Sequence, residues 1–239
     1  MRLNEKEFFN NIADKFDNKF NAYSKAAGIL RVQRRVKFFI ACCNLKPGLK
    51  VLEIGCGSGE YTKALLAKGI NVFATDCSIR MLQIGLAKVG AAEAQKFFLS
   101  DVQQLPLHDS SFDVVLGNSI LHHLDTGRVL VEILRVLKKG GRIVFSEPNM
   151  SNPYIFLQKR IGLLKKLAGD SPGETAFYRR DIRKTLEKIG FCNVEVRPFD
   201  FLYPFTPAGL VRLIDNMGRI LEKTFIRGIA GSLLITGQK

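Results

Sequence analysis

Three glycines behind an apolar run are the first residues of this chain whose types and spacing could do chemistry. Gly55, Gly57 and Gly59 alternate with small residues directly after residues 49–54, and a helical pattern begins behind them. A glycine-rich turn at the end of a strand lets a ligand approach the backbone, and the next helix presents free N–H groups and the positive end of its dipole. The turn therefore predicts a cofactor site, for either a dinucleotide pyrophosphate or part of another adenosine compound.

Two acidic residues near this turn favour an adenosine compound without a pyrophosphate. The dinucleotide fingerprint, G-x-G-x-x-G, has its third glycine where this chain has Glu60, and we expect a carboxylate there to face the phosphates. Asp76 ends the second apolar run, 21 residues after Gly55, which is about the separation at which an acid meets ribose hydroxyls in this kind of fold. Asp76 could also cap the helix that starts near Ser78, and the two roles are compatible.

Two adjacent histidines, His122 and His123, follow the fourth apolar run. Histidine titrates near neutral pH and can act as a general base where an accepting atom must lose a proton. Adjacent residues of a helix point about 100° apart, so we expect at most one of the two to face a substrate, and we favour His122. The alternative is a histidine that packs on the sheet edge or bonds to the backbone. His108 lies in a polar turn and is expected at the surface.

The elements that position these residues follow from the apolar pattern. From residue 47 onward short apolar runs alternate with helical patterns, which is typical of βαβ units and a mainly parallel sheet. Each helical pattern ends at a glycine suited to a C-cap. The predicted strands are 49–54, 70–76, 95–100, 112–118 and 141–147, and the predicted helices between them are 61–69, 80–90 and 127–141.

The segments on either side of this core are mainly helical. Residues 5–43 predict two amphipathic helices with a break near residues 21–28. After the core we expect a helical excursion (151–175), a helix (179–190), a long strand (191–205), a helical stretch (206–225) and a final strand (231–239). The chain therefore divides, within a single domain, into an N-terminal helical cap (1–46), a cofactor-binding core (47–150), and lid or insertion helices with the last two core strands (151–239).

Composition excludes several classes of protein. The chain has 239 residues, of which 46% are hydrophobic, as in an ordinary soluble globule. No apolar run approaches the roughly 20 residues of a membrane span, and the charged N-terminal residues lack the apolar region of a secretion signal. The five cysteines lack paired metal-type spacing, so we expect reduced thiols, a cytoplasmic location and no metal site.

Positive charge is concentrated in the flanking segments. Residues 1–46 contain ten Lys/Arg and four Asp/Glu, residues 47–150 contain eleven and ten, and residues 151–239 contain fifteen and eight, so +13 of the net charge of +14 lies outside the core. Such flanks suit an anionic substrate, a nucleic acid or an anionic membrane, or form a solvated surface without specific partners. Residues 155–169 and 210–228 mix apolar faces with cations, which fits lid helices or helices that lie on an anionic membrane.

Four blocks of sequence resemble class I S-adenosylmethionine-dependent methyltransferases, in the small-molecule, methyltransferase-11-like branch. They are residues 51–62, 74–82, 97–124 and 134–149, and a looser similarity extends over 179–196. The resemblance implies an α/β fold with a Rossmann-like, seven-stranded, mainly parallel sheet of order 3-2-1-4-5-7-6, the last strand antiparallel, with helices on both faces. It also implies S-adenosylmethionine as cofactor and S-adenosylhomocysteine as product.

The same resemblance assigns roles to residues in the core. Glu53 and the turn at Gly55, Cys56 and Gly57 resemble the part that holds the methionine portion of the cofactor. Asp76 resembles the ribose-binding acid, with Cys77 beside it. Further positions match residues that contact adenine (Met81, Asp101, Val102) and the methionine end (Asn118, Ser119), although Met81 could equally be a core residue.

The acceptor is expected to be a small anionic or amphipathic molecule, such as an intermediate of a lipid, quinone or sugar pathway. In this fold the N-terminal helices and the insertions after the fifth and sixth strands contact the substrate. A nucleic-acid methyltransferase and a non-catalytic cofactor-binding protein are the alternatives, and a hydride-transferring Rossmann enzyme is more distant. The candidate substrate residues, chosen by position, are Tyr23, Arg34, Arg35, Tyr154, Lys159, Arg160, Tyr178 and Arg179.

Overall fold

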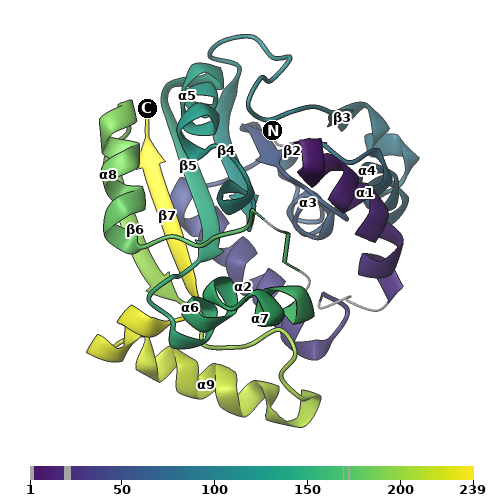
Figure 1. The fold of residues 1–239 in the computed structure, drawn as a ribbon. Helices are drawn as coiled ribbons and strands as arrows, with labels where there is room; N and C mark the ends of the chain where they lie inside the picture. The colour runs from purple at the N-terminus through teal and green to yellow at the C-terminus, as the bar shows by residue number, and fades with distance from the viewer. Residues whose placement is uncertain (1–2, 19–22, 169, 172) are drawn as a thin grey trace.

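The apolar runs form one seven-stranded sheet in the computed structural model, which describes residues 3–18, 23–168, 170–171 and 173–239 (Figure 1). The strand order is β3-β2-β1-β4-β5-β7-β6, and β7 is antiparallel to both of its neighbours. This confirms the predicted fold class and strand order. The strands are β1 (Lys50–Ile54), β2 (Asn71–Asp76), β3 (Phe97–Leu99), β4 (Phe112–Asn118), β5 (Leu137–Pro148), β6 (Cys192–Phe199) and β7 (Ser232–Gln238).

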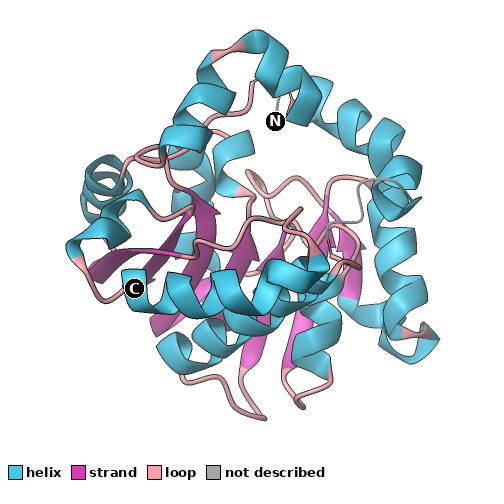
Figure 2. Cartoon of the chain, turned by 90° about the horizontal axis from the view of Figure 1, so that it is seen from below, coloured by secondary structure: helices cyan, strands magenta, loops and turns pink. Residues whose placement is uncertain are grey.

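Helices cover both faces of the sheet, as the view from below shows (Figure 2). One face packs against α2 (Ala26–Cys43), α3 (Glu60–Leu66) and α4 (Ile79–Val89). The other face packs against α5 (Thr126–Val136) and α8 (Arg179–Ile189). Apolar residues therefore point to both sides of the central strands, as expected for parallel strands that are buried on both faces.

Further helices lie at the edge of the sheet where the parallel strands end. They are α1 (Leu3–Asn18), α6 (Pro153–Arg160), α7 (Gly162–Ala168) and α9 (Val211–Leu221). In Figure 1 α6, α7 and α9 lie below this edge, and α1 lies across it beside α4. The Ser78 hydroxyl donates to Asn10 Oδ1 at 2.7 Å, which joins α1 to the start of α4. The N-terminal cap and the helices after β5 thus flank the end of the sheet at which open α/β folds bind ligands.

Strand register brings the candidate cofactor residues together. Glu53 of β1 lies opposite Ala74 of β2 on one side and Leu116 of β4 on the other. Both neighbours continue for two residues beyond these positions, to Asp76 and Asn118. The three polar side chains therefore reach the same edge of the sheet from adjacent strands.

Several element boundaries differ from the predictions, and two of the differences have a clear physical reason. The third core helix ends at Val136 rather than at residue 141, because Leu137 is completely buried and pairs with Phe112 as the first residue of β5. The strand predicted for 191–205 ends at Phe199, because Asp200 adopts a left-handed conformation with φ of 70°. Only the second of the three core helices has a glycine at its C-cap, Gly90; the C-cap residues of the other two are Ala67 and Leu137.

The cysteines, the lengths of the helices and the break between the first two helices can be compared with the predictions. The five cysteines are all free thiols. Among the described residues, no helix combines the length and the apolar character needed to cross a bilayer. The predicted break between the first two helices falls at residues 21–28, of which 21 and 22 lie outside the described residues. The division into cap, core and lid remains a prediction.

Candidate active site

The glycine turn between β1 and α3 is shaped by three left-handed glycines. Gly55, Gly57 and Gly59 have φ angles of 63°, 51° and 76°. A Cβ atom at Gly55 would lie 2.5 Å from the Ile120 side chain, and one at Gly59 would lie 2.8 Å from the Gly85 Cα. A Cβ atom at Gly57 would meet nothing within 4 Å. The first and third glycines are thus needed for packing, whereas Gly57 leaves open space beside its backbone, as a bound cofactor requires.

Glu60 does not face this open space. It is the first residue of α3, and its Oε1 lies 2.8 Å from Lys88 Nζ of α4. The expectation that this carboxylate would face bound phosphates was therefore wrong, because the first turn of α3 directs it toward the neighbouring helix. The exclusion of a dinucleotide has to rest on the other motifs.

Glu53 is a buried acid in the middle of the site. Its side chain points to the face covered by α3, where the Thr62 hydroxyl donates to Oε2 at 2.6 Å, and only 2% of the residue is exposed. Burial, with a smaller contribution from the nearby Asp76 charge, raises the pKa of Glu53 to about 8. In the absence of a nearby cation this carboxyl group is therefore largely protonated at neutral pH.

Asp76 connects the turn to the start of α4. Its Oδ2 accepts from the Gly57 N–H at 2.9 Å, and its Oδ1 accepts from the Ser78 N–H at 2.9 Å. The alternative role as helix cap was wrong, because Ser78 is the N-cap of α4 and accepts from the Met81 N–H. Burial raises the pKa of Asp76, although the two N–H groups oppose this. Each carboxylate oxygen retains a further lone pair for a ligand hydroxyl.

The residues expected around adenine lie near the ends of β2 and β3. Met81 and Val102 are buried, and Cys77 is half-buried with a pKa that burial raises to about 12. The Asp101 Oδ1 accepts from the Gln103 N–H at 2.9 Å. Their contacts with a cofactor, and the choice between a core and an adenine-binding role for Met81, remain predictions.

Asn118 presents an unpaired acceptor at the expected methionine end. Its Oδ1 is buried and has no hydrogen-bond partner among the described residues, while Nδ2 donates to Ser119 Oγ at 3.3 Å. A buried carbonyl oxygen needs a donor, and the ammonium group of S-adenosylmethionine would supply one. Both residues line a cavity of about 140 Å³, together with Tyr23, Gly28, Arg31, Arg35, Tyr61 and Pro204.

Two arginines of α2 make the wall of this cavity positive. Arg31 Nε and Arg35 Nη2 lie 3.1 and 2.7 Å from the same oxygen of Asp200, which leaves two cations against one carboxylate. Arg35 also donates to the hydroxyls of Ser146 and Ser232, each at 2.9 Å. Burial and, to a smaller extent, the Arg35 charge lower the pKa of Arg31, whereas the Asp200 charge acts in the opposite direction. The sequence singled out Arg35 but missed Arg31, although their spacing of four on one helix could have indicated the pair.

The other candidate substrate residues lie outside this cavity lining. Arg34 pairs with Asp215 and Glu222 and so joins α2 to α9. Tyr154 of α6 is half exposed and shares a hydrogen bond of 2.7 Å with the hydroxyl of Tyr203, the neighbour of the cavity residue Pro204. Four further residues are placed elsewhere: Tyr178 and Arg179 are exposed at the start of α8, Arg160 packs over the Phe156 ring, and Lys159 pairs with Asp170 and Glu174.

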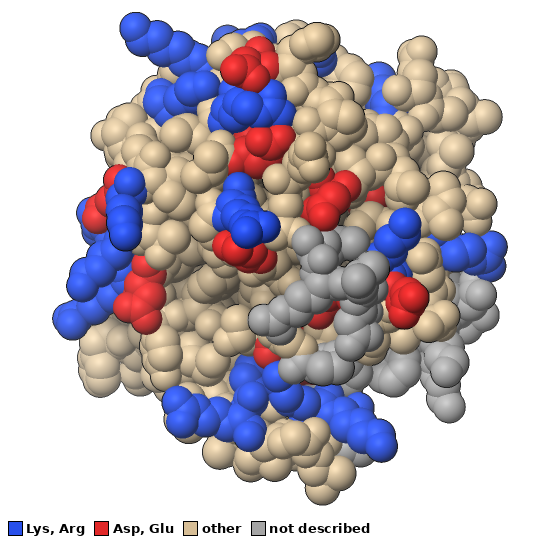
Figure 3. Space-filling model, turned by 45° about the horizontal axis from the view of Figure 1, so that its top comes forward, with Lys and Arg blue, Asp and Glu red and all other residues tan. Residues whose placement is uncertain are grey.

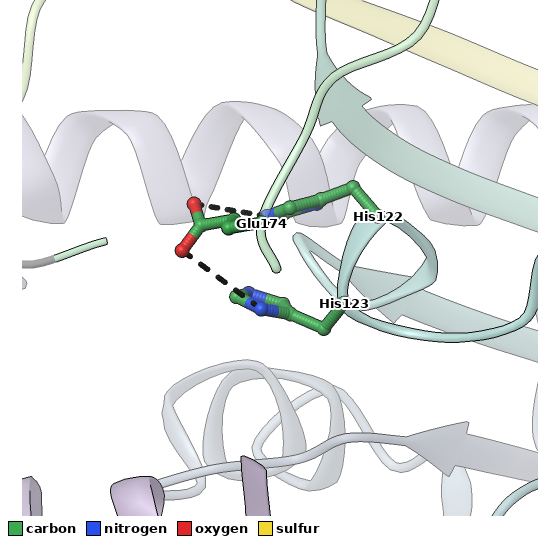
Figure 4. A group of neighbouring side chains, drawn as sticks. All are labelled: His122, His123 and Glu174. Carbon is green, nitrogen blue, oxygen red and sulfur yellow. Dashed lines mark ion pairs between the residues drawn. The ribbon is translucent and has the colours of Figure 1, made fainter. Parts of the chain in front are cut away.

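The two histidines lie in a short 3-10 turn, Leu121–His123, rather than in a helix. Their rings stack with centroids 4.1 Å apart, and both face Glu174 (Figure 4), so the expectation that they diverge was wrong. His122 Nδ1 lies 2.6 Å from Glu147, and Nε2 lies 3.3 Å from Glu174. Burial alone would lower the pKa of His122, but these two carboxylates outweigh it and raise the pKa to about 9. Both nitrogens are occupied, which does not favour His122 as a general base.

Curated proteins with similar sequences include methyltransferases. A family model described as a methyltransferase domain matches residues 52–145. Demethylmenaquinone methyltransferase of Bacillus mycoides (strain KBAB4) is 27% identical over 223 residues, covering 84% of this chain and 94% of that protein. The corresponding protein of Bacillus cereus (strain AH187) is 28% identical with the same coverage.

Solved structures show the same fold over almost the whole chain. A SAM-dependent methyltransferase of Thermotoga maritima, described as a possible histamine N-methyltransferase, has a TM-score of 0.69 and 21% identity, and covers 98% of this chain and 99% of that one. Phosphoethanolamine N-methyltransferase 2 of Haemonchus contortus, in complex with S-adenosyl-L-methionine, has a TM-score of 0.61 and 17% identity, with 97% of this chain and 60% of that one covered. The chain is a class I S-adenosylmethionine-dependent methyltransferase.

Proposed function

We propose that the enzyme methylates a small aromatic acceptor with an acidic hydroxyl, of the hydroquinone type, in its anionic form. The observation that carries this proposal is the excess positive charge of Arg31 and Arg35 at the cavity beside Asn118. The names of the curated relatives, which are demethylmenaquinone methyltransferases, support the quinone class. Tyr23 and Tyr61 add aromatic walls whose ring centroids are 6.2 Å apart in an edge-to-face arrangement.

The chain's own residues contribute positioning and charge to this reaction. When bound, S-adenosylmethionine supplies the activated methyl group. Arg31 and Arg35 would stabilise the deprotonated hydroxyl of the acceptor, so that its loss of a proton depends less on a protein base. Tyr23 stays neutral, because burial raises the pKa of its hydroxyl, and can therefore donate a hydrogen bond to an anionic oxygen.

A steady-state assay tests this proposal. With labelled cofactor and a reduced naphthoquinone that has a short tail, Arg31→Gln should lower kcat/KM by about 10- to 100-fold, the loss of one charge-assisted interaction. Arg183→Gln, on the exposed surface of α8, is the matched control and should leave kcat/KM unchanged. Turnover of neutral amines but of no phenolic or quinol acceptor, or equal rates for both variants, would contradict the proposal.

We further propose that α9 contacts an anionic membrane that holds such an acceptor. The inner side of α9 is buried at Val211 and Asp215, whereas Leu213, Met217 and Ile220 on its outer side are 57, 53 and 66% exposed. Phe225 just beyond the helix is 93% exposed. The cations Arg212, Arg219, Lys223 and Arg227 lie along the same segment. An apolar face bordered by cations is the pattern of a helix that lies in an interface.

The distribution of charge supports the same orientation. On the face shown in Figure 3, Lys and Arg gather in a band at the lower edge, on the side where Figure 1 places α6 and α7. Over the rest of that face basic and acidic side chains are mixed. The alternative of a lid does not explain the outer face of α9, because a lid would turn its apolar side toward the active site.

Vesicle flotation tests the membrane contact. The protein should float with vesicles that contain phosphatidylglycerol and remain behind with pure phosphatidylcholine, since the cations need anionic headgroups. Leu213→Ser with Ile220→Ser should abolish flotation. Val131→Ser, equally exposed at 56% on α5, is the matched control. Flotation that both sets of variants retain, or that is absent for the unmodified protein, would refute the contact.

A further inference from the structure

Three segments far apart in the sequence meet at the stacked histidines. Glu5 comes from α1, His122 and His123 come from the turn after β4, and Glu174 comes from the loop after α7. One ligand atom each of His122, His123 and Glu174 lies within 4.8 Å of the others (Figure 4). We propose that these three residues, with Glu5 as the fourth ligand, form a structural site for a divalent transition metal, with zinc as the best match.

Two separations between nitrogen and oxygen atoms, from His122 to Glu174 and from His123 to Glu5, fit a shared metal better than direct hydrogen bonds. His122 Nε2 is 3.3 Å from Glu174 Oε1, and His123 Nδ1 is 3.4 Å from Glu5 Oε2 and 3.9 Å from Glu174 Oε2. Four ligands at about 2.0–2.1 Å around a tetrahedral ion are about 3.3 Å apart. Hydrogen bonds between a charged nitrogen and a carboxylate are shorter, about 2.7–2.9 Å.

The surrounding groups orient the proposed ligands. Glu147 contacts His122 Nδ1 at 2.6 Å, and its other oxygen accepts from the Ile120 and Leu121 N–H groups at 3.0 and 2.9 Å. This leaves Nε2 of His122 directed at the proposed site, in the carboxylate–histidine–metal arrangement of many zinc proteins. The Ser171 hydroxyl donates to Glu5 at 2.6 Å, and its N–H donates to Glu174 at 3.0 Å, so both carboxylates are held as well.

The charges and the polar atoms around His122 and His123 favour the binding of a dication. The cluster contains four carboxylates, those of Glu5, Glu147, Asp170 and Glu174, and two lysines: Lys159 pairs with Asp170 and Glu174, and Lys165 donates to the Glu174 carbonyl oxygen. Glu5 is 4% exposed, and its Oε2 has no hydrogen-bond partner among the described residues although it points at His123. A bound dication would satisfy this atom and offset the excess negative charge.

The ligand set defines the class of metal and its role. Two imidazole nitrogens with carboxylates suit zinc or cobalt, whereas magnesium and calcium prefer oxygen ligands alone. Four protein ligands would close the coordination sphere, which is the pattern of a structural rather than a catalytic site. The ion would tie the N-terminal helix and the loop after α7 to the turn beside the cofactor. The expectation of no metal came from local spacing, which cannot reveal ligands at positions 5, 122, 123 and 174.

Cobalt titration of the purified full-length protein, stripped of metals with chelator, tests the site. We expect one Co²⁺ per chain with the strong visible bands of tetrahedral cobalt, and displacement of these bands by one equivalent of Zn²⁺. His123→Gln should weaken binding by about 100-fold or more, and Glu5→Gln by at least about 10-fold. His108→Gln removes the one other histidine of the chain, which is exposed, and is the matched control.

Circular dichroism establishes that each variant is folded, and Glu5→Gln serves if His123→Gln fails to fold. The proposal is overturned if the unmodified protein binds no cobalt, if the bound cobalt gives only weak octahedral bands, or if folded His123→Gln and Glu5→Gln bind as tightly as His108→Gln. Because the readouts are stoichiometry and spectra, they do not depend on the methyl acceptor.

Discussion

Replacement of Glu53 by glutamine should make the stability of the protein less sensitive to pH. Burial raises the pKa of Glu53 from 4.5 to about 8 in the folded protein. Between these two values the unfolded chain has released the proton and the folded chain has kept it, so the folded state binds more protons and the free energy of unfolding falls as pH rises. The slope is at most about 1.4 kcal/mol per pH unit, and the sum over the interval is about 5 kcal/mol as an upper bound.

The sign of this effect is opposite to that of an ion-paired acid. The stability associated with protonated Glu53 is present in full below pH 4.5 and is lost as the pH rises through about 8. The glutamine of Glu53→Gln cannot ionise, and it retains a carbonyl oxygen that can accept from Thr62. The free energy of unfolding of the variant should therefore rise steadily, relative to that of the parent protein, from pH 5 to pH 8. If the amide destabilises the folded protein by an amount that does not depend on pH, the plot of the free energy of unfolding against pH is displaced but keeps its slope.

Urea unfolding followed by circular dichroism at several pH values measures the difference directly. Glu187→Gln, on the exposed surface of α8, is the control and should run parallel to the parent protein. A constant difference in the free energy of unfolding between Glu53→Gln and the parent from pH 5 to pH 8 would refute a raised pKa for Glu53.

Three further substitutions test other parts of the site. Glu147→Gln should lower the free energy of unfolding by about 3 kcal/mol, because it removes the buried partner of His122; urea unfolding would contradict this if the loss were under about 0.5 kcal/mol. Asp76→Asn should weaken S-adenosylmethionine binding by about 10-fold in calorimetry, whereas exposed Asp109→Asn should not. Gly59→Ala should lower the melting temperature, at a cost of about 1–3 kcal/mol, since its Cβ would meet the Gly85 Cα at 2.8 Å at a φ of +76°; an unchanged melting temperature would be inconsistent with this packing.

Local patterns in the sequence predicted the sheet and its polar edge well. The apolar runs end at Asp76 and Asn118 in the structure as they do in the sequence, because in parallel strands burial and hydrogen bonding stop together. The first polar residue after such a run therefore marks the end of the strand. The boundary at Val136 was missed because Leu137 fits the apolar spacing of the preceding helix as well as that of the next strand.

The surroundings of each polar side chain could not be predicted in the same way. His122 was expected to be a base, but it has two acidic partners that lie far from it in the sequence. Glu147 is on β5, and Glu174 is on a loop some 50 residues after His122. Arg34 and Arg35 are adjacent in the sequence, yet one binds α9 and the other lines the cavity. Such contacts depend on tertiary packing between distant segments, which no local period records.

The lining of the cavity combines residues of the core with residues of the flanking segments. The methyltransferase family model covers residues 52–145, which include the glycine turn, Asp76 and Asn118. Arg31 and Arg35 lie before that range, and Asp200, which both of them contact, lies after it. In the function proposed above, the acceptor therefore meets residues of the flanks, among them Tyr23, Arg31 and Arg35, together with Tyr61 of the core. Methyltransferases that share this core can differ in their acceptors, and under the proposed function the charge of Arg31 and Arg35 is what selects an anionic one.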